Sequence, residues 1–324
     1  MDVAVGIDIG GTKVSGGVVT GEGQILHRAR AATPNRSTSP QVVEDTIVSV
    51  VEQLQEAAGA DVAVRAVGVG AAGWVSSDRA TVLFAPHLSW RHERLRDSLR
   101  SRIDAPVFVD NDANAAAWAE WRFGAARGQE DMVMITLGTG IGGAILREGR
   151  IDRGRWGLAG EFGHMQVVPD GQRCECGNRG CWEQYASGNA LVREARSMID
   201  AGSPIATDLA VRLRADGGPL TGPLVTAAAR EGDPTAVELL AEIGHWLGVG
   251  LANLAAALDP SLFVIGGGVS AAGDLLIAPA AAAFHRRLPG RGYRPAAQIV
   301  GAQLGNDAGL IGAADLAWSE IQGC

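Results

Sequence analysis

One sequence pattern occurs twice in this chain of 324 residues, and it limits the possible folds more than any other feature. Each copy is an apolar, strand-like run, a turn rich in glycine, and a second apolar run. The copies read VGIDIGGTKVSGGVV from Val5 and VMITLGTGIGGAIL from Val133. A repeat of this kind indicates a duplicated unit, and its short turns favour antiparallel hairpins. We therefore expect two lobes of similar topology, each opening with a hairpin.

Strand-like and helix-like segments alternate along the rest of the chain, which indicates the α/β class. The predicted strands cover residues 3–9, 14–20, 24–31, 65–70, 106–110, 132–137, 143–147, 262–265 and 298–300. The predicted helices cover residues 41–58, 91–102, 112–123, 188–200, 222–231, 235–257, 274–287 and 308–321. The first three strands follow one another through short turns and should form an antiparallel meander.

Charge and hydropathy exclude some classes of partner. The net charge is −8, so neither nucleic acid nor an anionic membrane is expected as the main partner. No apolar run of about 18 residues is free of charge and glycine, and the first residues have no features of a signal peptide. We therefore expect a cytoplasmic protein, in which cysteines are metal ligands or catalytic groups rather than disulfides.

The two glycine turns are typical of phosphate binding, because a backbone N–H approaches a phosphate closely only where no Cβ blocks it. Two rival motifs fail: the GxGxxG matches at Gly68 and Gly138 are not followed by helix-like sequence, and no P-loop pattern occurs. Asp8, just before the first turn, is placed to reach Mg²⁺ through water. The candidate phosphate-binding residues are Gly10, Gly11, Thr12 and Lys13 in the first turn and Gly138, Thr139, Gly140, Gly142 and Gly143 in the second.

Carboxylates and amides gather where a strand meets a helix, in the stretch VFVDNDAN from Val107. Phosphoryl transfer to an alcohol needs a carboxylate that accepts the hydroxyl proton, and amides such as Asn111 and Asn114 can bind sugar hydroxyls. Asp110 and Asp112 would lie on the same side of an extended segment. Spacing alone does not choose between them, and helix capping is the alternative role for Asp112.

A second cluster combines one histidine with three cysteines. His164, Cys174, Cys176 and Cys181 fall within eighteen residues, and Gly177 and Gly180 allow the loop to curl. Three thiolates and one imidazole make a closed tetrahedral set, so we predict a structural Zn²⁺ site. Two further carboxylates flank it, Glu161 and Glu183, and zinc would fix the loop that carries them.

Together these stretches resemble the ROK family of repressors and sugar kinases, and most closely its ATP-dependent glucose-phosphorylating members. The matching stretches, in family order along the chain, are DIGGTK from Asp8, NDAN from Asn111, LGTGIGG from Leu137, EFGH from Glu161, CECGNRGCWE from Cys174 and GGGV from Gly266.

The resemblance implies a fold, a reaction and an assembly. The fold is that of the actin-like ATPases (ribonuclease H-like), with duplicated β-β-β-α-β-α units and a central cleft between two lobes. The reaction is the phosphorylation of D-glucose at its 6-hydroxyl by ATP and Mg²⁺. The assembly is a homodimer or homotetramer.

The resemblance also assigns roles to residues. Asp112 is the general base, and the sugar is held by Asn111, Glu161, His164 and Glu183, with Gly73 lining the pocket. The two glycine turns hold the phosphates, and Gly266 and Gly267 lie near the adenosine. The smaller lobe is expected to span 1–111 plus 301–324, and the larger lobe 112–300.

Two alternatives accompany this interpretation. A sugar-sensing repressor is disfavoured, because only nine residues precede Gly10 here and a helix-turn-helix needs more. A kinase with another acceptor (mannose, fructose, allose or N-acetylmannosamine) stays open, because the loops around Glu161 and Glu183 decide the acceptor. Polyphosphate as the donor is disfavoured by the predicted zinc cluster.

Overall fold

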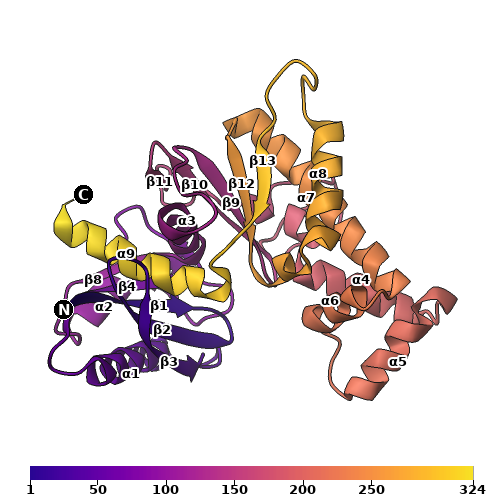
Figure 1. Cartoon of the computed structure of the whole chain (residues 1–324). Helices are drawn as coiled ribbons and strands as arrows, with labels where there is room; N and C mark the ends of the chain where they lie inside the picture. Colours follow the sequence, from indigo (N-terminus) through magenta and orange to yellow (C-terminus); the bar gives the residue numbers. More distant parts are fainter. Residues whose placement is uncertain (324) are drawn as a thin grey trace. The chain divides into compact units, whose positions relative to one another are not determined.

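The computed structural model describes residues 1–323, and its contacts divide the chain into two compact units (Figure 1). Unit 1 comprises Met1–Glu130, Ala144–Gly160 and the chain from Gln303 onward. Unit 2 comprises Asp131–Gly143 and Glu161–Ala302. Cys324 lies outside the described residues.

Unit 1 is built on a five-stranded sheet in the order β3-β2-β1-β4-β8. Its strands are β1 (Asp2–Ile9), β2 (Lys13–Val19), β3 (Ile25–Ala32), β4 (Ala63–Ala71) and β8 (Val107–Asn111). The first three pair antiparallel, which confirms the predicted meander, and β1, β4 and β8 pair in parallel. The carboxyl ends of the parallel strands, which carry Asp8 and Asp110, therefore lie at one edge.

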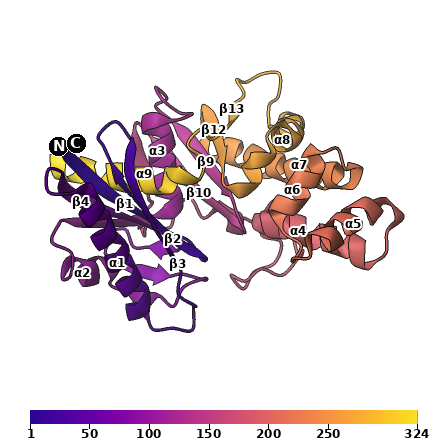
Figure 2. The same cartoon turned by 60° about the horizontal axis from the view of Figure 1, so that its bottom comes forward.

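Helices α1 (Pro40–Ala58) and α9 (Ala308–Gln322) cover opposite faces of this sheet (Figures 1 and 2). Glycines let the backbone of α9 approach the strands. A Cβ added to Gly68 would lie 1.7 Å from the carbonyl oxygen of Ala313. Gly68 therefore serves helix packing, which agrees with the rejection of its GxGxxG match as a nucleotide motif.

A second five-stranded sheet has the order β11-β10-β9-β12-β13. Its strands are β9 (Met132–Leu137), β10 (Ile141–Arg147), β11 (Arg150–Asp152), β12 (Leu262–Gly266) and β13 (Gln298–Gly301). Strand β12 pairs in parallel with both β9 and β13. The glycine turn 138–140 thus connects β9 and β10, as the repeated pattern predicts.

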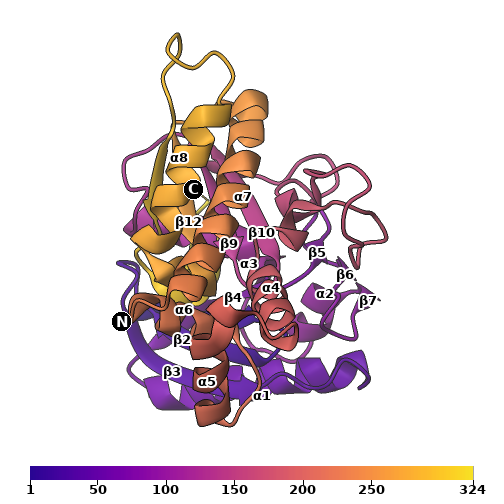
Figure 3. The same cartoon turned by 90° about the vertical axis from the view of Figure 1, so that its right-hand side faces the viewer.

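Unit 2 contains α4 to α8, of which α7 and α8 pack side by side (Figures 1 and 3). The helices are α4 (Gly188–Asp200), α5 (Thr207–Asp216), α6 (Gly222–Arg230), α7 (Pro234–Leu258) and α8 (Asp274–Arg287). Gly244 and Gly248 of α7 face α8, where an added Cβ would lie 2.6 Å and 2.2 Å from backbone oxygens. By length and hydropathy alone α7 could span a membrane, but 67% of its most apolar window is buried inside the protein, as in a core helix.

One predicted helix differs from the structure, and the structure contains further elements that were not predicted. The helix expected over 91–102 is α2 (Leu95–Arg100), because Arg91–Glu93 instead forms β7. Strand β7 joins β5 (Trp74–Val75) and β6 (Val82–Phe84) in a small sheet that the short runs did not reveal. Helix α5 was not predicted either.

Helix α3 (Asp112–Phe123) belongs to unit 1, because it packs against α9 and against strands β4 and β8. The expected lobe boundaries placed residues 112–123 in the larger lobe. The division into a smaller lobe of residues 1–111 plus 301–324 and a larger lobe of residues 112–300 stays a prediction.

Candidate active site and metal centre

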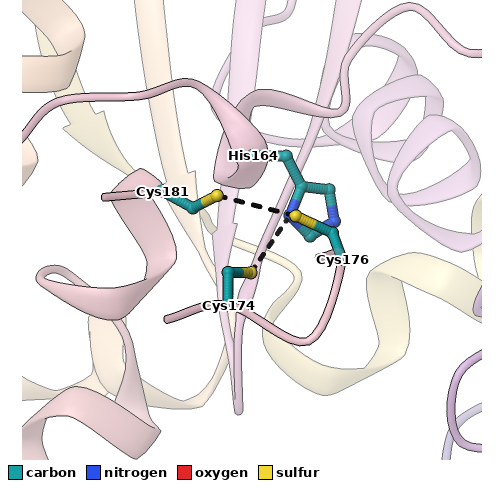
Figure 4. Close-up of side chains that lie close together, drawn as sticks. All are labelled: His164, Cys174, Cys176 and Cys181. Carbon is teal, nitrogen blue, oxygen red and sulfur yellow. Dashed lines mark hydrogen bonds between the residues drawn. The ribbon is translucent and has the colours of Figure 1, made fainter. Parts of the chain in front are cut away.

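Four side chains of unit 2 converge as the spacing predicts. His164, Cys174, Cys176 and Cys181 lie close together (Figure 4), and their donor atoms are all within 4.8 Å of one another. The Sγ atoms of Cys176 and Cys181 are 3.6 Å apart. Sγ of Cys174 is 3.7 Å from Nδ1 of His164. Nδ1 therefore faces the cluster, and Nε2 is left for another partner.

The donor set and its spacing fit zinc. With Zn–S near 2.3 Å and Zn–N near 2.0 Å, a regular tetrahedron has ligand separations of about 3.5–3.8 Å. The two separations above match that range. Burial raises the pKa of the Cys174 and Cys181 thiols, so a cation is what would hold them as thiolates. Four protein ligands leave no open position, which is the arrangement of a structural site.

Glycine makes the curl of this loop possible. Gly180 has φ 74°, and a Cβ there would lie 1.7 Å from the carbonyl oxygen of Val168. Isolated bridges pair Gln166 with Cys181 and Arg173 with Arg179. The loop is thus held by backbone pairing on both sides of the cysteines.

Both flanking carboxylates lie beside the cluster. Glu183 Oε1 is 3.0 Å from Sγ of Cys174 and 3.6 Å from Nδ1 of His164. Glu161 Oε2 is 4.0 Å from Nε2 of the same histidine. An added Cβ on Gly140 would lie 2.5 Å from Glu183 Oε2, so this carboxylate also reaches the second glycine turn.

The second glycine turn rests on the start of α4. The carbonyl of Gly138 accepts the N–H of Gly188 at 2.9 Å, and that of Thr139 accepts the N–H of Asn189 at 3.2 Å. Gly267 has φ 82° and lies against the backbone of Leu137, so the Gly266–Gly268 segment borders the same turn. The phosphate and adenosine candidates of unit 2 therefore lie next to one another.

The first glycine turn and Asp8 belong to unit 1. The N–H of Gly10 donates to the carbonyl of Lys13 at 3.0 Å, which closes the turn between β1 and β2. Burial raises the pKa of Asp8 to about 6, against an opposing effect of Lys13. A half-buried carboxylate at a strand end beside this turn is chemically suited to hold a metal-bound water.

Asp110 is fully engaged within unit 1. It is 5% exposed, and its Oδ2 accepts Nε of Arg153 at 3.0 Å. Its Oδ1 accepts the backbone N–H of Asn111 and Nδ2 of Asn114 at 2.9 and 3.0 Å. Asn114 is itself 3% exposed and holds Asp110, so its side chain is not at the surface where a sugar would bind.

Asp112 lies in a different setting from Asp110, because β8 ends at Asn111 and α3 begins at Asp112. The expectation that both acids lie on the same side of an extended segment is therefore wrong. Asn111 caps α3 by accepting the N–H groups of Ala113 and Asn114. Its Nδ2 donates to the carbonyl of Gly73 at 3.1 Å. Asp112 is half-buried, and it is not the cap.

A family model supplies the deciding comparison: the model of the ROK family matches residues 4–320. The chain belongs to the ROK family. It therefore has the actin-like ATPase fold of the ROK kinases, which confirms the predicted fold class.

Individual ROK proteins are similar over the whole chain. The glucokinase of Streptomyces coelicolor is 48% identical over 321 residues, which are 98% of each chain. The crystal structure of a ROK family glucokinase from Streptomyces griseus, in complex with glucose and AMPPNP, matches with a TM-score of 0.89 and 50% identity over 98% of this chain and 99% of that one. An N-acetylmannosamine kinase of Escherichia coli is 33% identical over 97% of this chain and 98% of its own.

Sequence reasoning missed the ion pairs that hold Asp110 at the end of β8. Arg153 bonds Asp110 through two nitrogens, and Arg79 lies 3.9 Å from the same carboxylate and bonds Glu320 at 2.5 Å. Nothing in the local sequence distinguishes these arginines from the many others in the chain. Their role becomes visible only in the structure, where Arg153 and Arg79 meet carboxylates that are distant in sequence.

Proposed function

We propose that this ROK protein transfers the γ-phosphoryl group of ATP to the 6-hydroxyl of D-glucose, giving glucose 6-phosphate and ADP. One observation carries the proposal: the similarity to a glucokinase that was crystallised with glucose and AMPPNP. That protein is 50% identical to this chain and matches its structure with a TM-score of 0.89 over nearly the full length of both. The phosphate turns, the half-buried Asp112 and the paired carboxylates near His164 supply the groups that this reaction needs.

Asp112 is the general base in this proposal. Its carboxylate accepts the proton of the sugar 6-hydroxyl as that oxygen bonds to the γ-phosphorus and the bond to the ADP oxygen breaks. Asp110 is the poorer candidate, since Arg153 and Asn114 occupy its oxygens and little of it is exposed. The half-burial of Asp112 at the start of α3 leaves it reachable by a substrate.

The sugar hydroxyls are held by Asn111, Glu161, His164 and Glu183, with Gly73 beside Asn111. Carboxylates accept hydroxyl hydrogen bonds, and Nε2 of His164 is directed away from the thiol cluster. Zinc, when bound, cross-links the loop and fixes these side chains. In this proposal the metal is structural and touches no reacting atom.

The nucleotide phosphates lie on the backbone N–H groups of the turns 10–13 and 138–143, and the adenosine lies near Gly266 and Gly267. Asp8 would hold Mg²⁺ through a water molecule. When bound, Mg²⁺ neutralises phosphate charge during transfer. The burial of Asp8 and its place beside the first turn support this assignment.

The base assignment is tested by Asp112→Asn, which keeps the shape of the side chain and removes the proton acceptor. We expect kcat to fall at least about 100-fold, because general base catalysis contributes that much or more. The measurement is a coupled assay of glucose 6-phosphate formation, with thermal melting to verify the fold. Asp110→Asn should instead lower the melting temperature. Near-normal turnover by a folded Asp112→Asn protein refutes the role.

The acceptor is tested with a panel of glucose, mannose, fructose, allose and N-acetylmannosamine at saturating ATP. We expect the highest kcat/KM with glucose. N-acetylmannosamine is the second candidate, because a kinase for that sugar is 33% identical over the full chain. A higher kcat/KM for any other sugar would replace glucose as the substrate and leave the kinase assignment standing.

We further propose a homodimer or homotetramer in the cytoplasm whose product enters glycolysis. Family resemblance supports the assembly, and light scattering after size-exclusion chromatography tests it. A monomer at micromolar concentration would contradict it.

A further inference from the structure

A basic hollow lies in unit 2 on residues that the proposed function does not use. It is a cavity of about 590 Å³ lined by His245, His285, Arg286, Arg287 and Arg291. His245 comes from the middle of α7. His285, Arg286 and Arg287 come from the last turn of α8, and Arg291 comes from the loop that follows it. Helices α7 and α8 lie side by side, and that loop follows α8 (Figures 1 and 3).

The arginines of this hollow are not neutralised by carboxylates. Among residues 1–323, no Asp or Glu lies within ion-pair distance of Arg286, Arg287 or Arg291. In the same unit Arg212 is paired with Glu231 and Arg294 with Asp259, whereas the exposed Arg196 and Arg214 have no ion-pair partner among the described residues either. What distinguishes these three cations is that they gather on one hollow, in a chain whose net charge is −8.

Helix capping explains only part of this cluster. Cationic side chains in the last turn of α8 interact favourably with the carbonyl end of that helix. Arg291 lies beyond the helix, and its side chain donates to the carbonyl of Arg286, which holds the loop over the helix end. His245 belongs to another helix. The convergence of three segments on one hollow is therefore not required by capping.

The electrostatic field of the arginines is felt across the hollow. Burial lowers the pKa of His245, the charges of Arg287 and Arg286 lower it further, and Glu242 on the same helix opposes them. His245 is then neutral at pH 7 and can still donate one hydrogen bond. The hollow combines guanidinium forks with an uncharged imidazole.

We propose that this hollow binds a small multivalent phosphate anion at a site separate from the glycine turns. Guanidinium groups match phosphate oxygens in a bidentate manner, and two adjacent arginines with Arg291 can hold more than one phosphate group. The volume suits a short oligophosphate or a phosphorylated metabolite. The site uses no residue of the proposed kinase site, so this proposal can be tested independently of the kinase activity.

The test is calorimetric titration of inorganic tripolyphosphate into the full chain. Saturating glucose, AMPPNP and excess Mg²⁺ occupy the kinase site, so any further binding is elsewhere. We expect one site per chain whose affinity falls with salt. The variant R286A/R287A should weaken it at least about tenfold, since each charge-assisted contact to phosphate is worth roughly that factor.

The matched control is R196A/R214A, which removes two exposed arginines elsewhere in unit 2 and should leave the affinity unchanged. An unaltered kcat and melting temperature for R286A/R287A shows that the variant is folded. Glucose 6-phosphate and orthophosphate, titrated under the same conditions, distinguish a metabolite from free phosphate as the source of the anion. Absence of binding by all three anions at 1 mM concentrations, or equal binding by R286A/R287A, overturns the proposal.

Discussion

At the scale of single residues, three aspartates show how the environment divides one chemical group among different roles. Asp110 is locked by Arg153 and Asn114 under the sheet edge. Asp112, two residues later, is half-buried at the start of a helix and is the proposed base. Asp8 is half-buried beside the first glycine turn, and desolvation raises its pKa to about 6. The neighbours of each carboxylate thus separate the structural role of Asp110 from the proposed catalytic role of Asp112 and the proposed metal-directed role of Asp8.

The raised pKa of Asp8 predicts a pH-dependent stability. The ordinary value is 3.8 and the folded value about 6, so the folded state holds this proton more tightly than the unfolded chain. The resulting stabilisation is fully present below pH 3.8 and is lost as the pH rises through 6. Asp8→Asn removes a partly desolvated charge and should therefore raise the melting temperature at pH 7.5 more than at pH 5.

Thermal melts of both proteins without nucleotide or magnesium check this prediction. The gain at pH 7.5 should be at most about 3 kcal/mol, since one pKa unit corresponds to 1.36 kcal/mol and the site is partly solvated. The variant should also lose kinase activity. An equal gain at both pH values would show that desolvation of the carboxylate is not the cause.

At the scale of elements, the loop from His164 to Glu183 joins the metal centre to the sugar and phosphate candidates. Its cysteines are positioned by backbone pairing around Gly180. Glu183 then touches both the thiol cluster and Gly140 of the second turn. A change in the metal is therefore expected to reach the substrate groups through one short segment.

Loss of the metal should abolish activity without altering a reacting group. We expect metal analysis to find about one zinc per chain and Cys174→Ala to lose both zinc and activity, because three remaining ligands bind zinc far more weakly. Cys324→Ala, the cysteine outside the cluster, is the matched control and should retain both. A metal-free preparation with full activity would contradict this.

At the scale of the whole molecule, one buried carboxylate ties together segments far apart in sequence. Glu120 of α3 is 0% exposed. It accepts the backbone N–H groups of Ala125 at 2.8 Å, Gln303 at 3.1 Å and Leu304 at 2.7 Å. The chain re-enters unit 1 at Gln303, so this residue anchors α9 against α3.

Glu120→Ala should lower the free energy of unfolding by about 3 kcal/mol, because it leaves three partly buried N–H donors without their acceptor. Glu120→Gln keeps one oxygen acceptor and should cost less. Glu52→Ala, at an exposed site on α1, is the control and should change little. Urea unfolding gives all three values. A loss below 1 kcal/mol for Glu120→Ala would show that water replaces the carboxylate.

The sequence predicted the parts of the site that depend on local spacing. The cysteine cluster, the two glycine turns, the meander and the α/β class all follow from residues close together in the chain, where backbone geometry leaves few alternatives. It did not predict β5–β7, because runs of two or three residues carry no usable period.

The sequence by itself determined which functional groups are available: thiolates and an imidazole for a metal, glycine turns for phosphate, and two aspartates for proton transfer. Only the tertiary structure decided that Arg153 and Asn114 occupy Asp110, that Glu120 anchors the return of the chain to unit 1, and that five basic residues line one hollow. The reason is physical, since charge pairing and burial depend on partners that packing brings together, such as Glu120 and Leu304, which are 184 positions apart in sequence.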